Sequence, residues 1–359
     1  MTGAALTTCR SDSVTCGRRE FLVGAFLVTI SGASLAQAPG KVHVIGVLLP
    51  WNAAPRDGSP PPAPRWLDEA LARNGFVVGR NVRIETAFGN VRIEREFDER
   101  ERERRDSLVA VAARKLLALD PDVIFVASAA GIAALQALTK SVPIVFANQV
   151  DPVQAGFVRE LRRPGGNVTG VALLYEELAE KRIELVRQLL PGAKRIALIA
   201  DFPLARERNR TFPSRLEAAA SRLGLLLIRG DVSAHGGDLA ATLRHVLESR
   251  PDAFMAFGTI PSAPDRFEQF LKFEKTHRIP FIGDGAEDGR GVVSYGADYD
   301  DHFRRAAEMI VRILRGASPA DTPVDRDTRF LLVVDLPLAK QIGIEIPPSI
   351  LLRADRIIR

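Results

Sequence analysis

Short apolar runs recur along this chain, and a stretch with helical periodicity follows almost every one of them. Runs of this kind, separated by helices, are typical of parallel strands that are covered on both faces. They fall into two series of similar size, before and after Pro164-Gly165-Gly166-Asn167. The pattern predicts an α/β fold with two doubly wound, Rossmann-like lobes, each built on a parallel central sheet. The expected strands are 42–49, 81–86, 122–126 and 143–146 in the first series, and 195–200, 225–229, 252–257 and 280–283 in the second.

The first forty residues predict a leader and not a folded segment. Arg18-Arg19 precede an apolar run from Phe21 to Ile30, and Ala36-Gln37-Ala38 has the form that a signal peptidase reads. Charge, apolar run and cleavage site come in the order of a secretory signal, and the run is shorter than the roughly 20 residues of a membrane-spanning helix. We therefore expect residues 1–38 to be a signal peptide and the mature protein to be periplasmic. The arginine pair favours the twin-arginine route, with the general secretory route as the alternative.

The composition and motif content argue against several classes of function. The net charge is only +5, and the arginines are interleaved with acidic residues, so the sequence lacks the basic stripe that nucleic-acid binding needs. It also lacks the P-loop, H-E-x-x-H and G-x-S-x-G motifs. The histidines have no ligand spacing, and we expect them at the surface or at strand ends. The sequence predicts a non-enzymatic protein without cofactor, metal or nucleic-acid partner. The cysteines, both in the leader, are Cys9 and Cys16, and the histidines are His43, His235, His245, His277 and His302.

Polar and aromatic residues follow the predicted strands at their carboxyl ends, where α/β folds bind ligands. A helix begins at Ser128, and its free N–H groups can hold a carboxylate, although Ser128 can equally be only a helix cap. Asp284 can pair with an amine, and Trp51 and Tyr175 can stack on an apolar ligand or only line the lobe interface. Together they predict a small amphipathic carboxylate, such as an amino acid, as the ligand. The candidate ligand-binding residues are Trp51, Asn52, Ser128, Ala129, Asn148, Asp151, Tyr175, Thr259, Asp284 and Tyr295.

Several stretches of the mature chain match one known family in the same order. The most specific is Arg163-Pro164-Gly165-Gly166-Asn167-Val168-Thr169-Gly170-Val171. On these stretches the chain resembles the ABC transporter substrate-binding family that includes tryptophan-binding proteins of the TrpX type. It departs from the family pattern at Trp51 with the proline-rich loop after it, and in the acidic segment 283–288, so the resemblance does not extend to tryptophan as the ligand. The other matching stretches are 75–82, 143–146, 151–158, 181–185, 294–296, 313–316 and 346–355.

The resemblance implies a type I periplasmic-binding-protein fold, with two lobes joined by three crossovers near 166–171, 288–293 and 319–324. The first lobe would comprise 41–165 plus 293–317, and the second 167–287 plus 322–359. It also implies the extracytoplasmic solute-binding component of an ABC-type uptake system, which captures its ligand between the lobes. The expected partner is an ABC permease in the inner membrane, and we expect a monomer. The alternative is a ligand-binding module that serves a sensor or scaffold partner.

Overall fold

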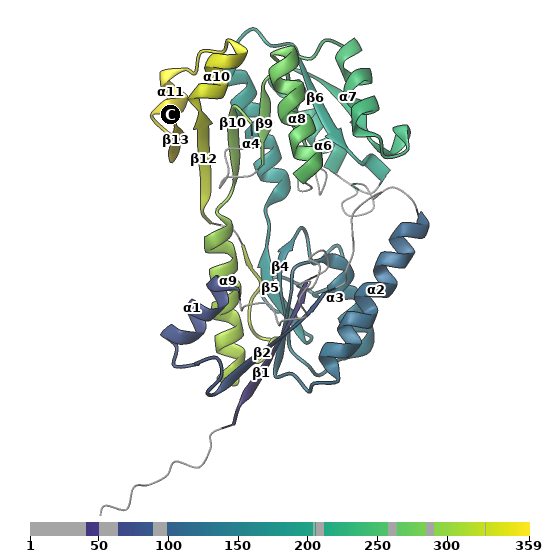
Figure 1. Ribbon diagram of the computed structural model, residues 1–359, viewed down its shortest axis with the longest axis vertical. Coiled ribbons are helices and arrows are strands. Elements are labelled where there is room, and N and C mark those ends of the chain that lie inside the picture. Colours follow the sequence, from purple (N-terminus) through teal and green to yellow (C-terminus); the bar gives the residue numbers. More distant parts are fainter. Residues whose placement is uncertain are drawn as a thin grey trace, which may run out of the picture. The chain divides into compact units, whose positions relative to one another are not determined.

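The computed structural model describes residues 41–49, 64–88, 99–203, 205, 212–257, 264–284, 291–326 and 328–359, and the expected leader lies outside this part. Within the described residues the strands form two sheets, one of six strands and one of seven (Figure 1). Each of the two series of apolar runs forms one of these sheets. The exceptions are strands beside the points where the chain passes from one sheet to the other, which we call changeovers. The predicted α/β class with two sheet-centred lobes is therefore confirmed.

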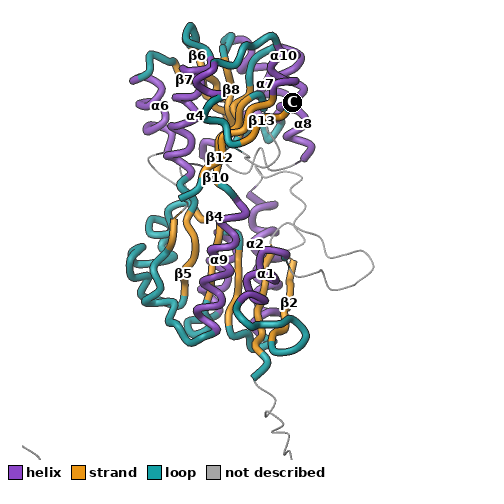
Figure 2. The backbone as a smooth tube through the Cα atoms, turned by 90° about the vertical axis from the view of Figure 1, so that its left-hand side faces the viewer, coloured by secondary structure: helices purple, strands orange, loops and turns teal. Residues whose placement is uncertain are grey.

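The first sheet has the strand order β11-β5-β4-β3-β1-β2, and all neighbouring strands in it are parallel. Helices α1 and α9 pack on one face, and α2 and α3 pack on the other. Helix α9 runs along β4 and β5 (Figure 2). Because both faces are covered, β3 is completely buried. The strands are β1 (His43–Leu49), β2 (Val82–Phe88), β3 (Val123–Val126), β4 (Ile144–Gln149), β5 (Val168–Ala172) and β11 (Asp325–Arg326), and the helices are α1 (Arg65–Arg73), α2 (Glu99–Leu117), α3 (Ala129–Leu138) and α9 (Tyr299–Leu314).

The second sheet has the order β13-β12-β10-β9-β8-β6-β7. Its neighbouring strands are parallel except for β10 and β12, which are antiparallel. This pair departs from the expected parallel sheet, because β10 leaves the second sheet and β12 returns to it. The strands are β6 (Arg195–Ala200), β7 (Leu226–Asp231), β8 (Ala253–Ala256), β9 (Phe281–Gly283), β10 (Val293–Ala297), β12 (Phe330–Asp335) and β13 (Arg356–Ile358).

Helices also cover both faces of the second sheet. Helices α4, α6, α10 and α11 share one hydrophobic core with the strands, and α7 and α8 share the core on the other face. A short 3-10 helix, η1 (Ser233–His235), precedes α7. The α-helices are α4 (Tyr175–Leu189), α6 (Phe212–Arg222), α7 (Leu239–Glu248), α8 (Pro264–His277), α10 (Leu336–Ile342) and α11 (Pro348–Leu351).

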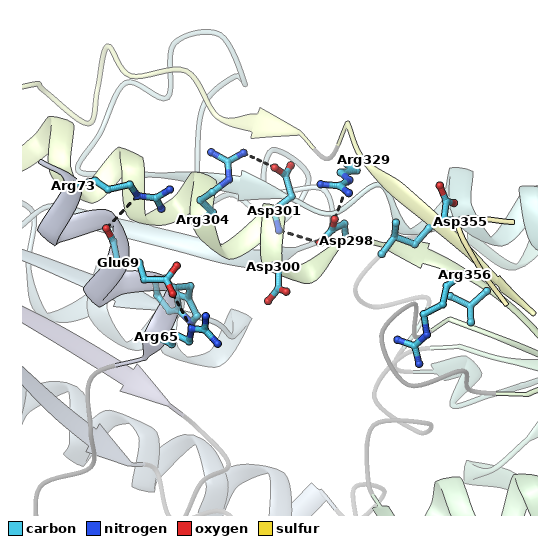
Figure 3. A pocket seen from close by; sticks show the side chains of 13 residues that line it. Arg65, Glu69, Arg73, Asp298, Asp300, Asp301, Arg304, Arg329, Asp355 and Arg356 are labelled. Atoms are coloured by element: carbon cyan, nitrogen blue, oxygen red, sulfur yellow. Dashed lines mark hydrogen bonds and ion pairs between the residues drawn. The ribbon is translucent and has the colours of Figure 1, made fainter. Parts of the chain in front are cut away.

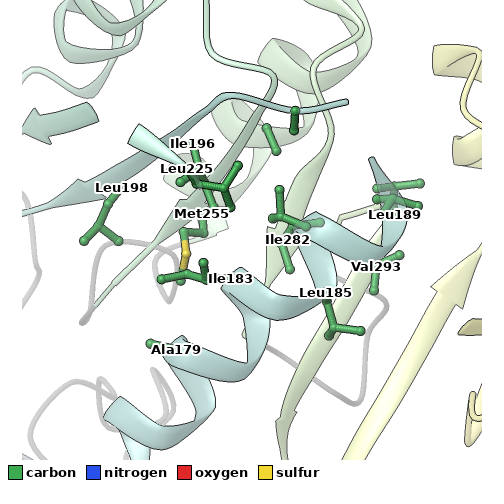
Figure 4. Packing of buried hydrophobic residues seen from close by; sticks show 14 of the residues in the cluster. Ala179, Ile183, Leu185, Leu189, Ile196, Leu198, Leu225, Met255, Ile282 and Val293 are labelled. Carbon is green, nitrogen blue, oxygen red and sulfur yellow. The ribbon is translucent and has the colours of Figure 1, made fainter. Parts of the chain in front are cut away.

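Helix α4 shows how the sequence builds this core. Ala179, Ile183 and Val186 recur every three or four residues, so they lie on one face of the helix and are buried. That face shares one core with Ile196 and Leu198 of β6, and Met255 lies close to Ile183 (Figure 4). Complete burial of one such isoleucine contributes about 2 kcal/mol. The second core therefore depends on the periodicity that the sequence already shows.

In the part of the chain that the structure describes, three changeovers connect the sheets, and they follow β5, β10 and β11. Each lies some residues later than expected, because β5 and β11 still pair in the first sheet and β10 still pairs in the second. Helix α9, which follows β10, packs on the first sheet. The division into lobes stays a prediction, and we now place its boundaries at the ends of these three strands.

Polar contacts tie the changeovers to one another. The Nε of Arg329 lies 3.1 Å from Oδ2 of Asp298, and the backbone N–H of Asp298 donates to the carbonyl of Arg329 at 3.0 Å. Asp298 is also the N-cap residue of α9, where its Oδ1 accepts from the N–H of Asp301 at 3.1 Å. At the first changeover, the buried Thr169 hydroxyl donates to the carbonyl of Thr322 at 2.8 Å. The contact between Thr169 and Thr322 joins segments that are more than one hundred residues apart. The contact between Asp298 and Arg329 joins segments that are about thirty residues apart.

Candidate functional site

The helix that follows β3 begins at Ser128, as predicted. Ser128 is the N-cap residue of α3, and its Oγ accepts from the N–H of Gly131 at 3.1 Å. A side chain at Gly131 would not fit, because its Cβ would lie 2.5 Å from Cγ2 of Val126. The first turn of α3, which begins at Ala129, contains no acidic residue, so its own sequence does not neutralise the positive end of the helix dipole. Ser128 is thus a cap, and anion binding at this helix start stays a prediction.

The end of β4 contains an irregularity at Asn148. The pairing with β5 shifts between Phe146 and Gln149, which leaves Asn148 out of the regular ladder. Gly170 of β5 permits the close approach, because a Cβ there would lie 2.2 Å from the Phe146 carbonyl oxygen. Asn148 has a φ of +59°, in the left-handed region that asparagine tolerates better than most residues. Such bulges often redirect a side chain next to a binding site.

His302 of α9 supports this irregular backbone. Its Nε2 accepts from the backbone N–H of Asn148 at 2.9 Å, and its side chain is almost fully buried. The expectation that the histidines lie at the surface or at strand ends is wrong for His302. A signal was present in the sequence, because His302 lies on the same face of α9 as the buried residues Ala306 and Ile310.

Asp151 lies three residues after Asn148, and its backbone is also in the left-handed region. Its φ is +41°, and its Oδ1 accepts from the N–H of Gln154 at 3.0 Å. Asp151 lines a cavity of about 200 Å³ together with Tyr175, Glu176 and Arg215. In this cavity Arg215 pairs with the buried Glu176 at 2.8 Å, and burial raises the pKa of the Glu176 carboxyl. The cavity therefore lies at the first changeover, between groups of opposite charge.

Tyr175 and Asp284 contact each other directly. The Tyr175 hydroxyl donates to Oδ2 of Asp284 at 2.7 Å, which joins the start of α4 to the end of β9. The Tyr175 ring is buried, with the Phe257 ring 4.4 Å away in an edge-on arrangement and the Arg182 guanidinium 5.3 Å from its centroid. Burial, with the Asp284 charge beside it, raises the pKa of Tyr175 well above its usual value. Tyr175 thus remains protonated and orients Asp284, and its buried ring has little surface left for stacking on a ligand.

Tyr295 lies in the strand that precedes the second changeover and not in a loop. It lies in the middle of β10 opposite Leu332, and its carbonyl accepts from Nε of the fully buried Arg182 at 2.9 Å. Its side chain is partly buried and packs against a small cluster that includes Tyr175. Burial raises the pKa of the Tyr295 hydroxyl. Three further predicted residues, Trp51, Asn52 and Thr259, lie outside the described residues.

A second cavity, of about 820 Å³, lies beside α1 and α9 and reaches β12 and β13 (Figure 3). Its walls carry as many arginines as carboxylates, and several of these are already paired, including Arg65 with Glu69 at 2.7 Å and Arg329 with Asp298. Among the described residues, no predicted ligand-binding residue lines it. The cavity is therefore a charged pocket beside the changeovers, separate from the described candidates for ligand binding.

The described residues contain no group of three or more His, Cys, Asp or Glu side chains that could hold a metal ion. Among them, no helix is both long and apolar enough to cross a membrane. The structure places polar groups at two sets of strand ends: Ser128 and Asn148 at the neighbouring strands β3 and β4 of the first sheet, and Asp284 with Tyr175 at β9 of the second.

The model of the ABC transporter substrate binding protein family matches residues 88–358, well over half of the chain. The chain belongs to this family. The match includes β3, β4 and all of the second sheet, so it covers the described strand ends at which the polar groups lie. The family resemblance drawn from the sequence is confirmed.

Individual relatives agree with this membership. A solved domain from Streptococcus pneumoniae in complex with L-Trp is 27% identical, with a TM-score of 0.70, and the match covers 88% of this chain and 99% of that one. A conserved domain protein from Vibrio cholerae is 24% identical, with a TM-score of 0.72 over 88% of this chain and 100% of that one, and supports the fold. The tyrosine-binding protein of Clostridioides difficile is 25% identical over 218 residues, which are 59% of this chain and 60% of that relative. This substrate-binding protein thus spans less than two thirds of that relative's length.

Proposed function

We propose that this substrate-binding protein captures an amino acid with an apolar side chain, such as tryptophan or tyrosine, at the carboxyl ends of its strands. The observation that carries the proposal is that one of these strand ends favours a negatively charged group and another favours a positively charged group. The positive end of the α3 dipole at Ser128, which no acidic residue in the first turn neutralises, favours an anion, and the Asp284 carboxylate favours a cation. A zwitterion matches both, and the L-Trp and tyrosine relatives support an amino acid.

The Tyr175–Asp284 hydrogen bond supports the amine side of this proposal. Tyr175 donates to Oδ2 of Asp284, so Oδ1 remains to accept from a ligand ammonium group. The buried phenol cannot rotate away, because Phe257 and Arg182 pack against its ring. Asp284 would therefore present its carboxylate in one orientation, which lowers the ordering cost of binding.

We also propose that the protein is exported, works in the periplasm as a monomer and delivers its ligand to an ABC permease. Family membership and the leader-like order of charge, apolar run and Ala36-Gln37-Ala38 support this part. Each lobe supplies part of the contacts, so binding should be accompanied by closure of the lobes. A sensor or scaffold partner in place of a permease stays the alternative, and a permease that binds the loaded protein more tightly than the empty one would decide between them.

A thermal-shift screen of the mature protein tests the ligand class. The panel contains the twenty amino acids, aromatic acids without an amine, sugars and polyamines. A ligand at a hundred times its Kd should raise the free energy of unfolding by about 2.7 kcal/mol. The proposal predicts that an apolar amino acid gives the largest shift, and a shift with sugars or polyamines alone would refute it.

Isothermal titration of two variants then tests the amine partner. Asp284→Asn should raise the Kd for the amino acid by at least about tenfold, because it removes a charge that faces the ammonium group. The matched control is Asp68→Asn, which removes an exposed carboxylate on α1 and should leave the Kd unchanged. If Asp284→Asn binds as tightly as the parent, the ligand class can stand but Asp284 is not the amine partner.

A further inference from the structure

We propose that His302 is a positioning residue for ligand binding, and that it acts through Asn148, whose side-chain amide accepts a hydrogen bond from the ligand's ammonium group. This inference rests on the proposed function for the class of ligand. It adds His302 to the site and gives a role to Asn148, which was already a candidate ligand-binding residue. The argument starts from the backbone at the end of β4.

The backbone of Asn148 is held in an unusual conformation by a contact from outside its own sheet. The shift in pairing between β4 and β5 takes the Asn148 N–H out of the ladder, and this N–H would otherwise be left without a partner. The imidazole of His302 accepts it at 2.9 Å. Because His302 lies in the first turns of α9, directly after the second changeover, the contact links a hinge element to the end of β4.

His302 is itself fixed in place. Its side chain is 1% exposed, and its backbone N–H donates to the carbonyl of Asp298, the N-cap residue of α9. The Phe303 ring stands edge-on to the imidazole, with 5.8 Å between the centroids. An acceptor held this rigidly fixes the left-handed φ of Asn148, and with it the direction of the Asn148 side chain.

The side chain of Asn148 has an unmet hydrogen-bonding capacity. Its Oδ1 is buried and has no hydrogen-bond partner. An orphaned buried acceptor is costly, and such groups in folded proteins call for an explanation. The end of β4 lies beside the end of β3, where Ser128 begins α3, so the amide belongs to the region proposed to hold the amino-acid head group. An ammonium group has three N–H donors, and can bond to Asn148 and Asp284 together.

The test is a double-mutant cycle on the full mature protein, with L-tryptophan and L-tyrosine as titrants. Asn148→Gly removes the amide and suits the positive φ, so the backbone is preserved. We expect Asn148→Gly and His302→Ala each to raise the Kd for the amino acid about tenfold. The double variant should lose little more than either single variant, because His302 acts through Asn148. Losses that multiply to about a hundredfold, or a parent-like Kd for His302→Ala, would overturn the inference.

Two further variants separate positioning from stability. Glutamine can offer an amide oxygen to the Asn148 N–H, so His302→Gln should bind within about threefold of the parent. Leu116→Ala removes a buried side chain of α2, on the other face of the sheet, and should lower Tm without changing the Kd. If His302→Gln fails to restore the affinity that His302→Ala loses while its Tm matches the parent, the acceptor role is wrong.

A ligand analogue and a ligand-free measurement complete the test. An indole acid without the amine should bind Asn148→Gly as tightly as it binds the parent, and an equal loss for this acid and for tryptophan would refute the ammonium contact. In the absence of ligand, amide hydrogen exchange at Asn148 should be at least tenfold faster in His302→Ala than in the parent. If no amino acid binds the parent, the proposed function fails, and unchanged exchange at Asn148 then overturns the His302 inference separately.

Discussion

Glu274 provides a test of how burial affects charge in this fold. It lies on α8 and is completely buried. Its Oε1 accepts from the N–H of Phe281 at 2.8 Å and of Val292 at 3.1 Å, so it clamps the segments that lead into β9 and β10. Burial raises the pKa of the Glu274 carboxyl from 4.5 to about 7, although both N–H groups favour the charged form.

The direction of the pH effect follows from this pKa. As pH rises from about 4.5 to about 7, the unfolded chain releases a proton that the folded chain still holds. The free energy of unfolding therefore falls across this interval, and the difference between the two pKa values corresponds to about 3 kcal/mol. The stabilising contribution of the neutral carboxyl is complete below pH 4.5 and is lost above pH 7.

Glu274→Gln should remove most of this dependence. The amide oxygen can accept from the same two N–H groups and carries no charge at any pH. At pH 8 we expect the free energy of unfolding to rise by about 1–3 kcal/mol over the parent, the lower value applying if the new buried N–H finds no acceptor. At pH 4.5 the stability should not increase. Urea denaturation followed by circular dichroism measures both.

A substitution of an exposed carboxylate serves as the control. Glu345→Gln removes an exposed carboxylate from the segment between α10 and α11, and should leave the stability difference between pH 4.5 and pH 8 as in the parent. A Glu274→Gln protein with the same pH dependence as the parent would show that Glu274 is charged in the fold at little cost.

Three other substitutions have defined expectations. Gly170→Ala should destabilise the protein by at least about 2 kcal/mol in urea, because its Cβ would meet the Phe146 carbonyl at 2.2 Å; a parent-like midpoint would refute this. Ser128→Ala should cost about 1 kcal/mol of stability through loss of the α3 cap, and an unchanged midpoint would mean that the 3.1 Å bond contributes nothing. Tyr175→Phe should lower stability by about 1 kcal/mol and alter ligand affinity by freeing Asp284, and no change in either quantity would contradict the orienting role.

The strands were the easiest part of the fold to predict, because a buried parallel strand is a continuous apolar run. The expected strand 195–200 coincides with β6, and 42–49 differs from β1 by one residue. The antiparallel pairing of β10 and β12 was not foreseen. No local pattern distinguishes a strand that leaves a sheet from one that stays in it.

The candidate site was predictable only as far as strand order determines it. Ser128 and Asn148 lie at the ends of neighbouring strands, which follows from the alternation of strands and helices. The contact between Tyr175 and Asp284, which are more than one hundred residues apart, has no local signature. His302 was missed because its role depends on a bulge in β4, and the sequence pattern shows only that it shares the buried face of α9.

The antiparallel pairing of β10 with β12 restricts the motion by which the proposed closure of the lobes could take place. Two of the three connections between the sheets are hydrogen-bonded to each other up to Ala297 and Phe330, and the pair continues into the contact between Asp298 and Arg329. They must bend as one two-stranded ribbon and not as independent linkers. The lobes are therefore expected to rotate about a single axis fixed by this ribbon, so substitutions at its end should change the amplitude and rate of closure together while leaving the ligand contacts intact.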